Sequence, residues 1–340
     1  MKHVTKTIAV LGTMALTAGL SACSSSTAGD DSLSLVFLAS SSQNGYNQAV
    51  YEGIEGRAAE LSEELGVEIS TEIQDGQFDA NTQLSQMQNA GTNGQFDSII
   101  VQPHDGPGLG AAFPLGQDVP VVAVLNPIGP DINKMEPQVE GVVSTVASPP
   151  KNSAKLQAET VVDYCADIDP CKIGLLAGLL NSPLDIERVK VWKEVLGEHD
   201  NIEIVATLEG GYDRDKSLTA VANLLQGNKD INGILSIADQ QTMGAQIALE
   251  NAGIEPSSIF LNGGGGTTEA IKAVREGKWT NDLMSFPVTM GERAVEQAVN
   301  AVRDEPVETV IDSDTLLDIG PIATKEDLEA NPDFTGQWNG

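Results

Sequence analysis

Apolar runs and amphipathic segments alternate along the first half of the chain. The predicted strands are residues 33–39, 67–73, 96–101, 119–125 and a short one near 141–146. The runs at 96–101 and 119–125 are continuously apolar, as in parallel strands that are buried on both faces. Helical spacing of apolar residues predicts helices over 50–65 and 80–90, whereas Pro114 leaves only a poor helix over 108–117. The pattern is that of repeated strand–helix units.

The second half of the chain repeats this alternation. Its predicted strands are 172–180, 202–208, 231–237, 259–262 and 279–284. Its predicted helices are 153–165, 184–198, 215–226, 243–252, 267–276 and 289–303. About five strand–helix units in each half predict an α/β protein of two doubly wound, Rossmann-like lobes with parallel sheets. Ligands of such sheets bind at the carboxyl ends of the strands, so the strand-to-helix loops are the place to look for a site.

The first residues have the pattern of a secretion signal. Residues 1–22 combine Lys2 and Lys6 with an apolar stretch that is too short for a confident membrane span. The run Leu20-Ser-Ala-Cys23 resembles the lipobox of bacterial lipoproteins, and a Ser-rich tether follows within residues 23–32. We therefore expect an extracytoplasmic protein of the cell envelope, anchored by lipid on Cys23. The alternative is an ordinary secreted protein that has a cysteine at this position.

Composition restricts the partners of this chain. Its 340 residues include 49 acidic and 19 basic side chains, for a net charge of −30, which argues against binding to nucleic acid or to anionic lipid. Hydrophobic residues make up 41%, enough for a sizeable core. Cys165 and Cys171 remain once Cys23 is assigned to lipid, and an oxidising envelope would let them form a small disulfide loop. Two free thiols are the alternative.

Catalytic and cofactor motifs are weak throughout the sequence. His104 follows a predicted strand, and we interpret it as a solvated loop histidine, with a ligand contact as the alternative. No further His/Cys cluster accompanies it, so no metal site is predicted. Residues 263–266 are four glycines that lack the G-x-G-x-x-G spacing, and we interpret them as a turn lining the cleft. We expect neither an enzyme nor a bound cofactor.

Several local runs occur in a recognisable order along the chain. They are 36–47 (VFLASSSQNGYN), 96–103 (FDSIIVQP), 119–125 (VPVVAVL), 211–218 (GYDRDKSL) with 223–225 (NLL), 238–245 (ADQQTMGA) and 273–278 (AVREGK). Together they resemble type I periplasmic binding proteins of the ribose/galactose class, the substrate-binding components of ABC importers. The resemblance implies three crossovers, near 143–146, 285–287 and 312–314. It implies discontinuous lobes, formed by 33–144 with 287–312 and by 145–286 with 313–340.

The same resemblance implies ligand contacts at ten positions. They are Ser40, Asn44, Tyr46, Asn47, Asn126, Arg188, Tyr212, Asp239, Asn262 and Gly265. Hydroxyl and amide groups suit sugar hydroxyls, and aromatic rings stack on the apolar face of a sugar. The alternatives are a turn cap and a core tyrosine for the first loop, and a solvated helix residue for Arg188.

The chain also departs from the family's pattern. Sugar binders usually have Asp followed by Arg where this chain has Asn126 and Pro127, and an Asp where it has Gly265. Ala238 replaces the usual Asn before Asp239, and Ser285 replaces the usual hinge amide. These changes leave a furanose, a polyol, a modified or smaller sugar and a nucleoside-like ligand open. A highly anionic ligand is disfavoured, because the loops offer few cations.

These observations predict hinge closure without chemistry. We expect a monomer that captures a small polar, sugar-like ligand between its lobes and delivers it to an ABC permease. A ligand-sensing receptor and a nucleoside-type binding protein are the alternatives, with a secreted enzyme on a Rossmann-like scaffold behind them.

Overall fold

A computed structural model of the chain describes residues 32–316 and 319–340. The predicted signal, the lipid anchor at Cys23 and all but the last residue of the tether lie outside the described residues. Within the described ranges, no helix is both long enough and apolar enough to cross a membrane.

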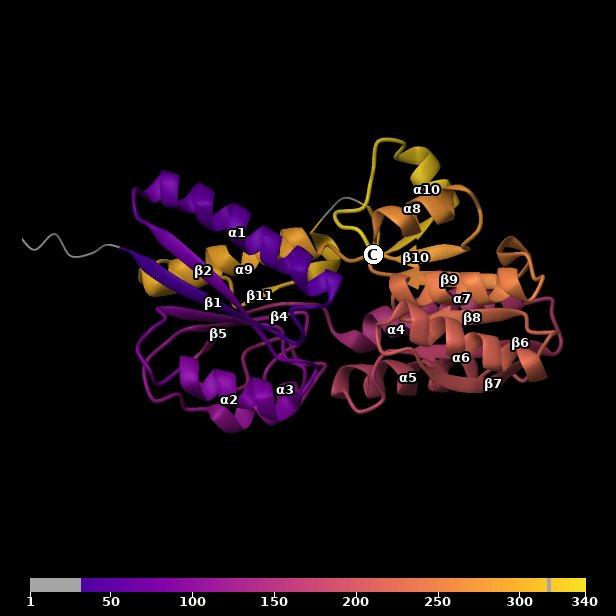
Figure 1. Ribbon diagram of the computed structural model, residues 1–340, viewed down its shortest axis with the longest axis horizontal. Helices are drawn as coiled ribbons and strands as arrows, with labels where there is room; N and C mark the ends of the chain where they lie inside the picture. Colours follow the sequence, from indigo (N-terminus) through magenta and orange to yellow (C-terminus); the bar gives the residue numbers. More distant parts are fainter. Residues whose placement is uncertain (1–31, 317–318) are drawn as a thin grey trace, which may run out of the picture. The chain divides into compact units, whose positions relative to one another are not determined.

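The first lobe is built on a six-stranded parallel sheet in the order β11-β5-β4-β3-β1-β2. Its strands are β1 (Leu33–Ala39), β2 (Ile69–Asp75), β3 (Ser98–Val101), β4 (Val121–Val124), β5 (Val142–Val146) and β11 (Val310–Ile311). Helices α1 (Gly45–Leu65) and α9 (Pro287–Val302) cover one face of this sheet, as Figure 1 shows. The short α3 (Gly106–Leu109) and α2 (Ala80–Ala90) cover the other.

The second lobe has a sheet of six strands in the order β12-β10-β9-β8-β6-β7. Its strands are β6 (Cys171–Ala177), β7 (Ile202–Glu209), β8 (Gly233–Ser236), β9 (Phe260–Gly264), β10 (Asn281–Leu283) and β12 (Ile322–Thr324). All are parallel except β12, which pairs antiparallel with β10. One face is covered by α4 (Pro150–Cys165) and α5 (Pro183–Leu196). The other is covered by α6 (Arg214–Gly227), α7 (Asp239–Asn251), α8 (Thr268–Arg275) and α10 (Lys325–Ala330).

The contact between α1 and α9 depends on two glycines. A Cβ added at Gly53 would lie 2.0 Å from the Val288 carbonyl oxygen, and one at Gly291 would lie 2.0 Å from the Val50 carbonyl oxygen. Any side chain at either position would push the helices apart. This packing fixes α9, which is remote in sequence, onto the sheet of the first lobe.

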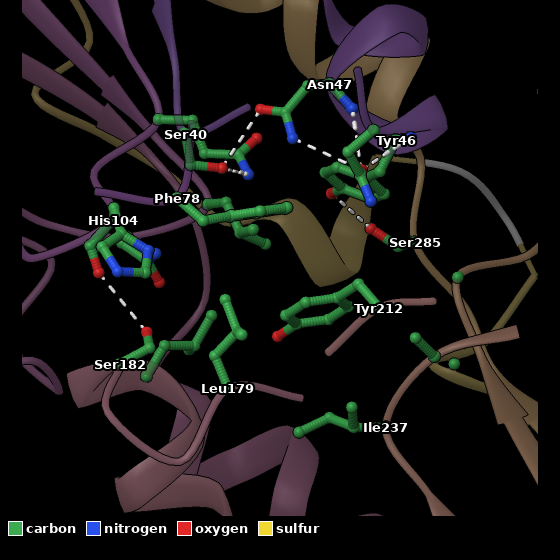
Figure 2. A pocket seen from close by; sticks show the side chains of 18 of the residues that line it. Ser40, Tyr46, Asn47, Phe78, His104, Leu179, Ser182, Tyr212, Ile237 and Ser285 are labelled. Carbon is green, nitrogen blue, oxygen red and sulfur yellow. Dashed lines mark hydrogen bonds between the residues drawn. The ribbon is translucent and has the colours of Figure 1, made fainter. Parts of the chain in front are cut away.

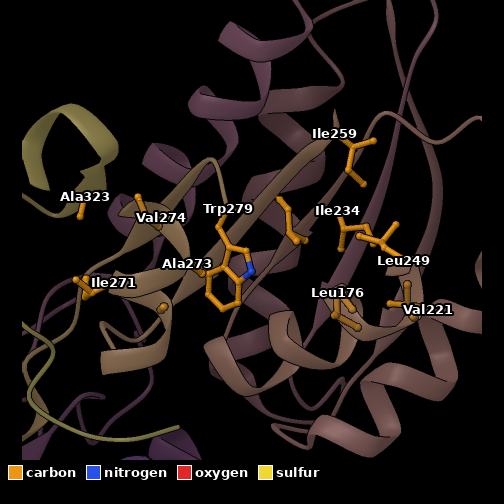
Figure 3. Packing of buried hydrophobic residues seen from close by; sticks show 14 of the residues in the cluster. Leu176, Val221, Ile234, Leu249, Ile259, Ile271, Ala273, Val274, Trp279 and Ala323 are labelled. Atoms are coloured by element: carbon orange, nitrogen blue, oxygen red, sulfur yellow. The ribbon is translucent and has the colours of Figure 1, made fainter. Parts of the chain in front are cut away.

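Large apolar side chains fill the core beneath α6, α7 and α8. Trp279 is 2% exposed and packs with Leu176, Ile234 and Leu249 in one continuous cluster, shown in Figure 3. Its indole Nε1 donates to Gln246 Oε1 at 2.8 Å, so burial leaves no polar atom of this ring without a partner.

The predicted fold class of two doubly wound α/β lobes is confirmed. The boundary at 144/145 differs from the structure, because β5 continues to Val146 within the first sheet. The chain then enters α4 in the second lobe, returns with α9, and leaves the first sheet again after β11. Cys165 and Cys171 are joined by a disulfide that links the end of α4 to the start of β6.

One local prediction was wrong, and short elements near the end of the chain were missed. The helix expected over 108–117 is the single turn α3 with one 3₁₀ turn after it, because Pro114 and the surrounding glycines do not sustain a helix. The antiparallel β12 and the helix α10 were not predicted, because three-residue strands show too little periodicity.

Candidate functional site: a cleft between the lobes

A cavity lies where the carboxyl ends of the strands of both lobes meet. It offers about 100 Å³ to the centre of a water-sized molecule, which is room for several waters or one small ring. Figure 2 shows side chains of both lobes that line it. From the first lobe come Ser40, Asn44, Tyr46, Asn47, Phe78, Gln102, Pro103, His104, Leu125 and Asn126. The remaining lining residues are Leu179, Ser182, Leu184, Arg188, Tyr212, Ile237, Ala238, Gln240, Gly264, Gly265, Leu283, Ser285 and Trp338.

The loop after β1 is held by a helix cap. Asn44 is the N-cap of α1, and its side-chain oxygen accepts from the backbone N–H groups of Tyr46 and Asn47. The cap directs the Tyr46 ring into the cleft, where its hydroxyl lies 2.8 Å from the Ser285 hydroxyl. Burial raises the pKa of Tyr46 to about 12, so the phenol stays neutral. Asn44 therefore acts as a turn cap and also lines the cavity.

Two residues that line this cavity each have a buried amide oxygen without a donor. Gln102 donates from Nε2 to the Ser40 hydroxyl at 3.1 Å, and Asn126 donates from Nδ2 to the Pro103 carbonyl at 2.9 Å. These bonds fix the two amide planes. Gln102 Oε1 and Asn126 Oδ1 accept no hydrogen bond from any described residue. A buried acceptor without a donor costs about 1–3 kcal/mol, so both oxygens are poised to accept from hydroxyl groups of a ligand.

A buried carboxylate organises the side of the cleft formed by the second lobe. Asp185 is fully buried in α5 and accepts from the Leu179 N–H at 2.6 Å and from the Tyr212 hydroxyl at 2.7 Å. Arg188 Nη1 lies 3.5 Å from the same carboxylate. Burial raises the pKa of Asp185, while Arg188 and the hydrogen bonds oppose that rise. Arg188 thus enters the cavity as a cation that is already paired.

Aromatic rings from both lobes meet across the cleft. The rings of Phe78 and Tyr212 are stacked with centroids 6.1 Å apart and an interplanar angle of 20°. Phe78, Leu125 and Tyr212 all have positive φ, between 52° and 62°, which is uncommon for residues other than glycine. Three strained positions at one cavity agree with the tendency of such strain to gather at ligand sites. The Ser182 hydroxyl also crosses the cleft to donate to the His104 carbonyl at 3.3 Å.

His104 is not the solvated loop residue that the sequence suggested. It lines the cavity and is 8% exposed. Burial lowers the pKa of His104, so the ring is neutral near pH 7. Among the described residues no three His, Cys, Asp or Glu side chains are grouped to hold a metal ion.

Two of the ten candidate residues do not line the cavity. Asp239 is fully buried behind the glycine turn, where it accepts from the Gly264 N–H at 2.7 Å and the Thr267 N–H at 2.8 Å. Asn262 is fully buried within β9 and accepts from the Ser236 N–H at 2.8 Å. Both assignments are corrected, because these side chains are fully used in shaping the strand ends.

The other eight candidates line the cavity. They are Ser40, Asn44, Tyr46, Asn47, Asn126, Arg188, Tyr212 and Gly265. Sequence reasoning did not include Phe78, Gln102 or Trp338 among the candidates. Phe78 and Gln102 lie just beyond β2 and β3, so strand-end position was a usable signal for them. Trp338 lies in the C-terminal tail, where apolar residues follow no periodic pattern.

The sequence profile of the periplasmic binding protein domain matches residues 35–306. The chain belongs to this family. The match covers both lobes up to the region after α9, and it ends before the C-terminal tail.

Curated relatives of this periplasmic binding protein include a ribose import binding protein, RbsB, of Escherichia coli (strain K12). It is 24% identical over 273 residues, covering 80% of this chain and 86% of the relative. A putative rhizopine-binding protein of Rhizobium meliloti is 27% identical over 249 residues, covering 72% of this chain and 77% of the relative.

Solved structures of similar fold include the Caulobacter myo-inositol binding protein bound to myo-inositol. It has a TM-score of 0.73 and 22% identity, covering 88% of this chain and 95% of its own. A solute-binding protein from Actinobacillus succinogenes 130z with bound D-allose has a TM-score of 0.72 and 20% identity, and the match covers 88% of this chain and 99% of the other. At this identity the likeness establishes the shared fold.

Proposed function

We propose that this periplasmic binding protein captures a neutral polyhydroxylated molecule, a monosaccharide or a cyclitol, and delivers it to an ABC import permease. The observation that carries the proposal is a pair of buried acceptors without donors, Gln102 Oε1 and Asn126 Oδ1, on two residues that line the cavity. Hydroxyl groups supply such donors. The relatives named for ribose, and the neighbours holding myo-inositol and D-allose, support the same chemical class.

Charge supports a neutral ligand. Arg188 is the one lining residue with a permanent charge, and it is paired with the buried Asp185. Burial lowers the pKa of His104, so this ring adds no charge near pH 7. A free anion or cation would therefore meet no uncompensated partner in the cavity.

Closure of the lobes is the proposed mechanism. The contacts between Phe78 and Tyr212 and between Ser182 and His104 join loops of opposite lobes, so they form only when the cleft is shut. A ligand that touches both lobes stabilises this shut form over an open one. A micromolar affinity corresponds to about 8 kcal/mol, which a few good hydrogen bonds and a stacked ring supply. No step of this mechanism makes or breaks a covalent bond.

We propose extracytoplasmic display through lipid on Cys23, as the lipobox-like run suggests. Labelling of growing cells with an alkyne-tagged fatty acid tests this. Label on the wild type and none on Cys23→Ser supports the anchor, whereas equal label on both refutes it.

A thermal-shift screen tests the ligand class. The mature chain is melted with D-ribose, D-allose, myo-inositol, adenosine and L-leucine. A ligand at a hundredfold its Kd adds about 2.7 kcal/mol of stability, or roughly 5–10 °C for a chain of this size. A shift with a sugar or cyclitol alone supports the proposal. A shift with adenosine or leucine alone, or with none of the five, contradicts it.

Two amide variants then test the residues that carry the proposal. Gln102→Leu and Asn126→Leu remove an acceptor each, and each should raise the Kd about 5- to 150-fold, the equivalent of 1–3 kcal/mol. Gln86→Leu is the matched control, because Gln86 Oε1 is also buried without a partner but does not line the cavity. An effect of the control as large as that of the two variants would contradict the role of these acceptors.

A further inference from the structure

Trp338 brings the C-terminal tail into the wall of the cavity. The indole is 6% exposed, and its Nε1 donates to the Gly265 carbonyl at 2.8 Å. The ring meets Tyr46 edge-on, with centroids 5.6 Å apart and an interplanar angle of 89°. One side chain from the end of the chain thus contacts the first turn of α1 in the first lobe and the turn after β9 in the second. The matched family profile ends at residue 306, so nothing in that match accounts for this residue.

The tail around Trp338 is held on both sides. The Thr268 N–H donates to the Trp338 carbonyl at 2.9 Å, which ties the tail to α8 in the second lobe. The Gln337 side chain bonds to Thr289 in α9 of the first lobe, donating to its hydroxyl at 2.6 Å and accepting from its N–H at 3.3 Å. Figure 1 marks the C-terminus near α8 and β10. Because the carbonyl of Trp338 and the side chain of the preceding Gln337 are both anchored, we treat the indole as a fixed wall.

Trp338 separates two cavities. On one side lies the cleft described above, with its space of about 100 Å³. On the other lies a second cavity that is open to solvent, lined by the exposed side chains of Gln48, Glu52 and Glu55 of α1 and by the tail. Trp338 lines both. Gly45 leaves room for the ring, since a Cβ there would lie 3.3 Å from the indole Cζ3.

We propose that Trp338 determines the size of ligand that this protein accepts, by closing the cleft against the second cavity. With the indole in place the cleft holds a single ring. Without it the two spaces join, and a ligand with a second ring can extend past Tyr46 toward the polar surface of α1. The kind of ligand in this inference rests on the proposed function. The position of Trp338 as a wall rests on the packing of the ring alone.

Isothermal titration of three variants tests the selectivity. Trp338→Ala removes the wall, and Trp338→Leu keeps an apolar contact should the alanine variant fold poorly. Asn339→Ala is the matched control, because Asn339 is exposed, adjacent in the tail and lines the second cavity only. The probes are D-ribose, D-allose and myo-inositol as single rings, and cellobiose and maltose as double rings.

The wild type and Asn339→Ala should bind a single-ring probe and reject both disaccharides. The Trp338 variants should lose at least tenfold in affinity for that probe and gain measurable binding of a disaccharide. Unchanged affinity for the single ring, with both disaccharides still rejected, would overturn the proposal.

A crystal structure of the leucine variant provides a reading that needs no ligand. One continuous cavity from Gln102 to Glu52 supports the wall, and two cavities that remain separate refute it. Should no single-ring probe bind the wild type, the proposed function fails, while this structure still decides the role of Trp338.

Discussion

Replacement of Asp185 by alanine should destabilise the second lobe strongly. The carboxylate is fully buried and has three partners, which are the Leu179 N–H, the Tyr212 hydroxyl and the Arg188 guanidinium. All three are donors, so alanine leaves each of them without this acceptor. Removal of one partner from a buried charged network costs about 3–5 kcal/mol.

The loss divides unevenly among the three partners. The bonds from Leu179 at 2.6 Å and Tyr212 at 2.7 Å are short, and each leaves a buried donor that costs about 1–3 kcal/mol when unmet. The Arg188 contact is longer at 3.5 Å, and its side chain is 14% exposed, so water can replace part of it. Alanine also removes the cost of burying the Asp185 carboxylate, and this gain offsets part of the summed loss from the three donors. We therefore expect a net loss of about 3–5 kcal/mol.

Urea denaturation of the mature chain measures this loss, followed by circular dichroism, with thermal melts alongside. The expected fall in melting temperature is about 6–20 °C. Glu209→Ala is the matched control, because Glu209 accepts from the next backbone N–H, that of Leu180, at 2.9 Å but is exposed. That variant should lose less than about 1 kcal/mol. Equal losses in the two variants would refute the argument that burial of the Asp185 network sets its energy.

Two further predictions concern the helix contact of the first lobe and the carboxyl pair of the second. Gly53→Ala should lower the free energy of unfolding, measured in urea, by about 1–3 kcal/mol, because the new Cβ meets the Val288 carbonyl. The control Gly56→Ala, whose Cβ would have nothing within 4 Å, should raise it by about 0.5–1 kcal/mol. Equal effects of the two variants would contradict this packing. Burial and the neighbouring Asp239 raise the pKa of Asp282 well above its usual value. The stability that this group contributes to the folded state is therefore fully present below about pH 4, and it is lost as the pH rises through the pKa of the folded protein. Asp282→Asn keeps the side chain neutral, so its melts from pH 4 to 8 should show a flatter loss of stability than those of the wild type. An unchanged slope would count against the raised pKa of Asp282.

Periodicity in the sequence was sufficient for the fold class and for part of the site. The run predicted at 96–101 contains the strand β3 (Ser98–Val101), which is fully buried because a parallel sheet covered by helices leaves no polar face. Ser40 and Asn126 could be found because carboxyl ends of parallel strands converge on one edge. These are consequences of local pattern and chain order, which a single sequence contains.

Only the tertiary structure decided which polar groups face the ligand. Asp239 and Gln102 both follow strands, yet Asp239 accepts hydrogen bonds that hold the glycine turn, while Gln102 lines the cavity and has an oxygen without a donor. Trp338 reaches the cleft through contacts with Thr268 and Gly265, which are about seventy residues away in sequence. Sequence by itself thus determined two α/β lobes and a site at their strand ends. The structure decided the lining, because hydrogen-bond partners and the path of a non-periodic tail are set by long-range packing.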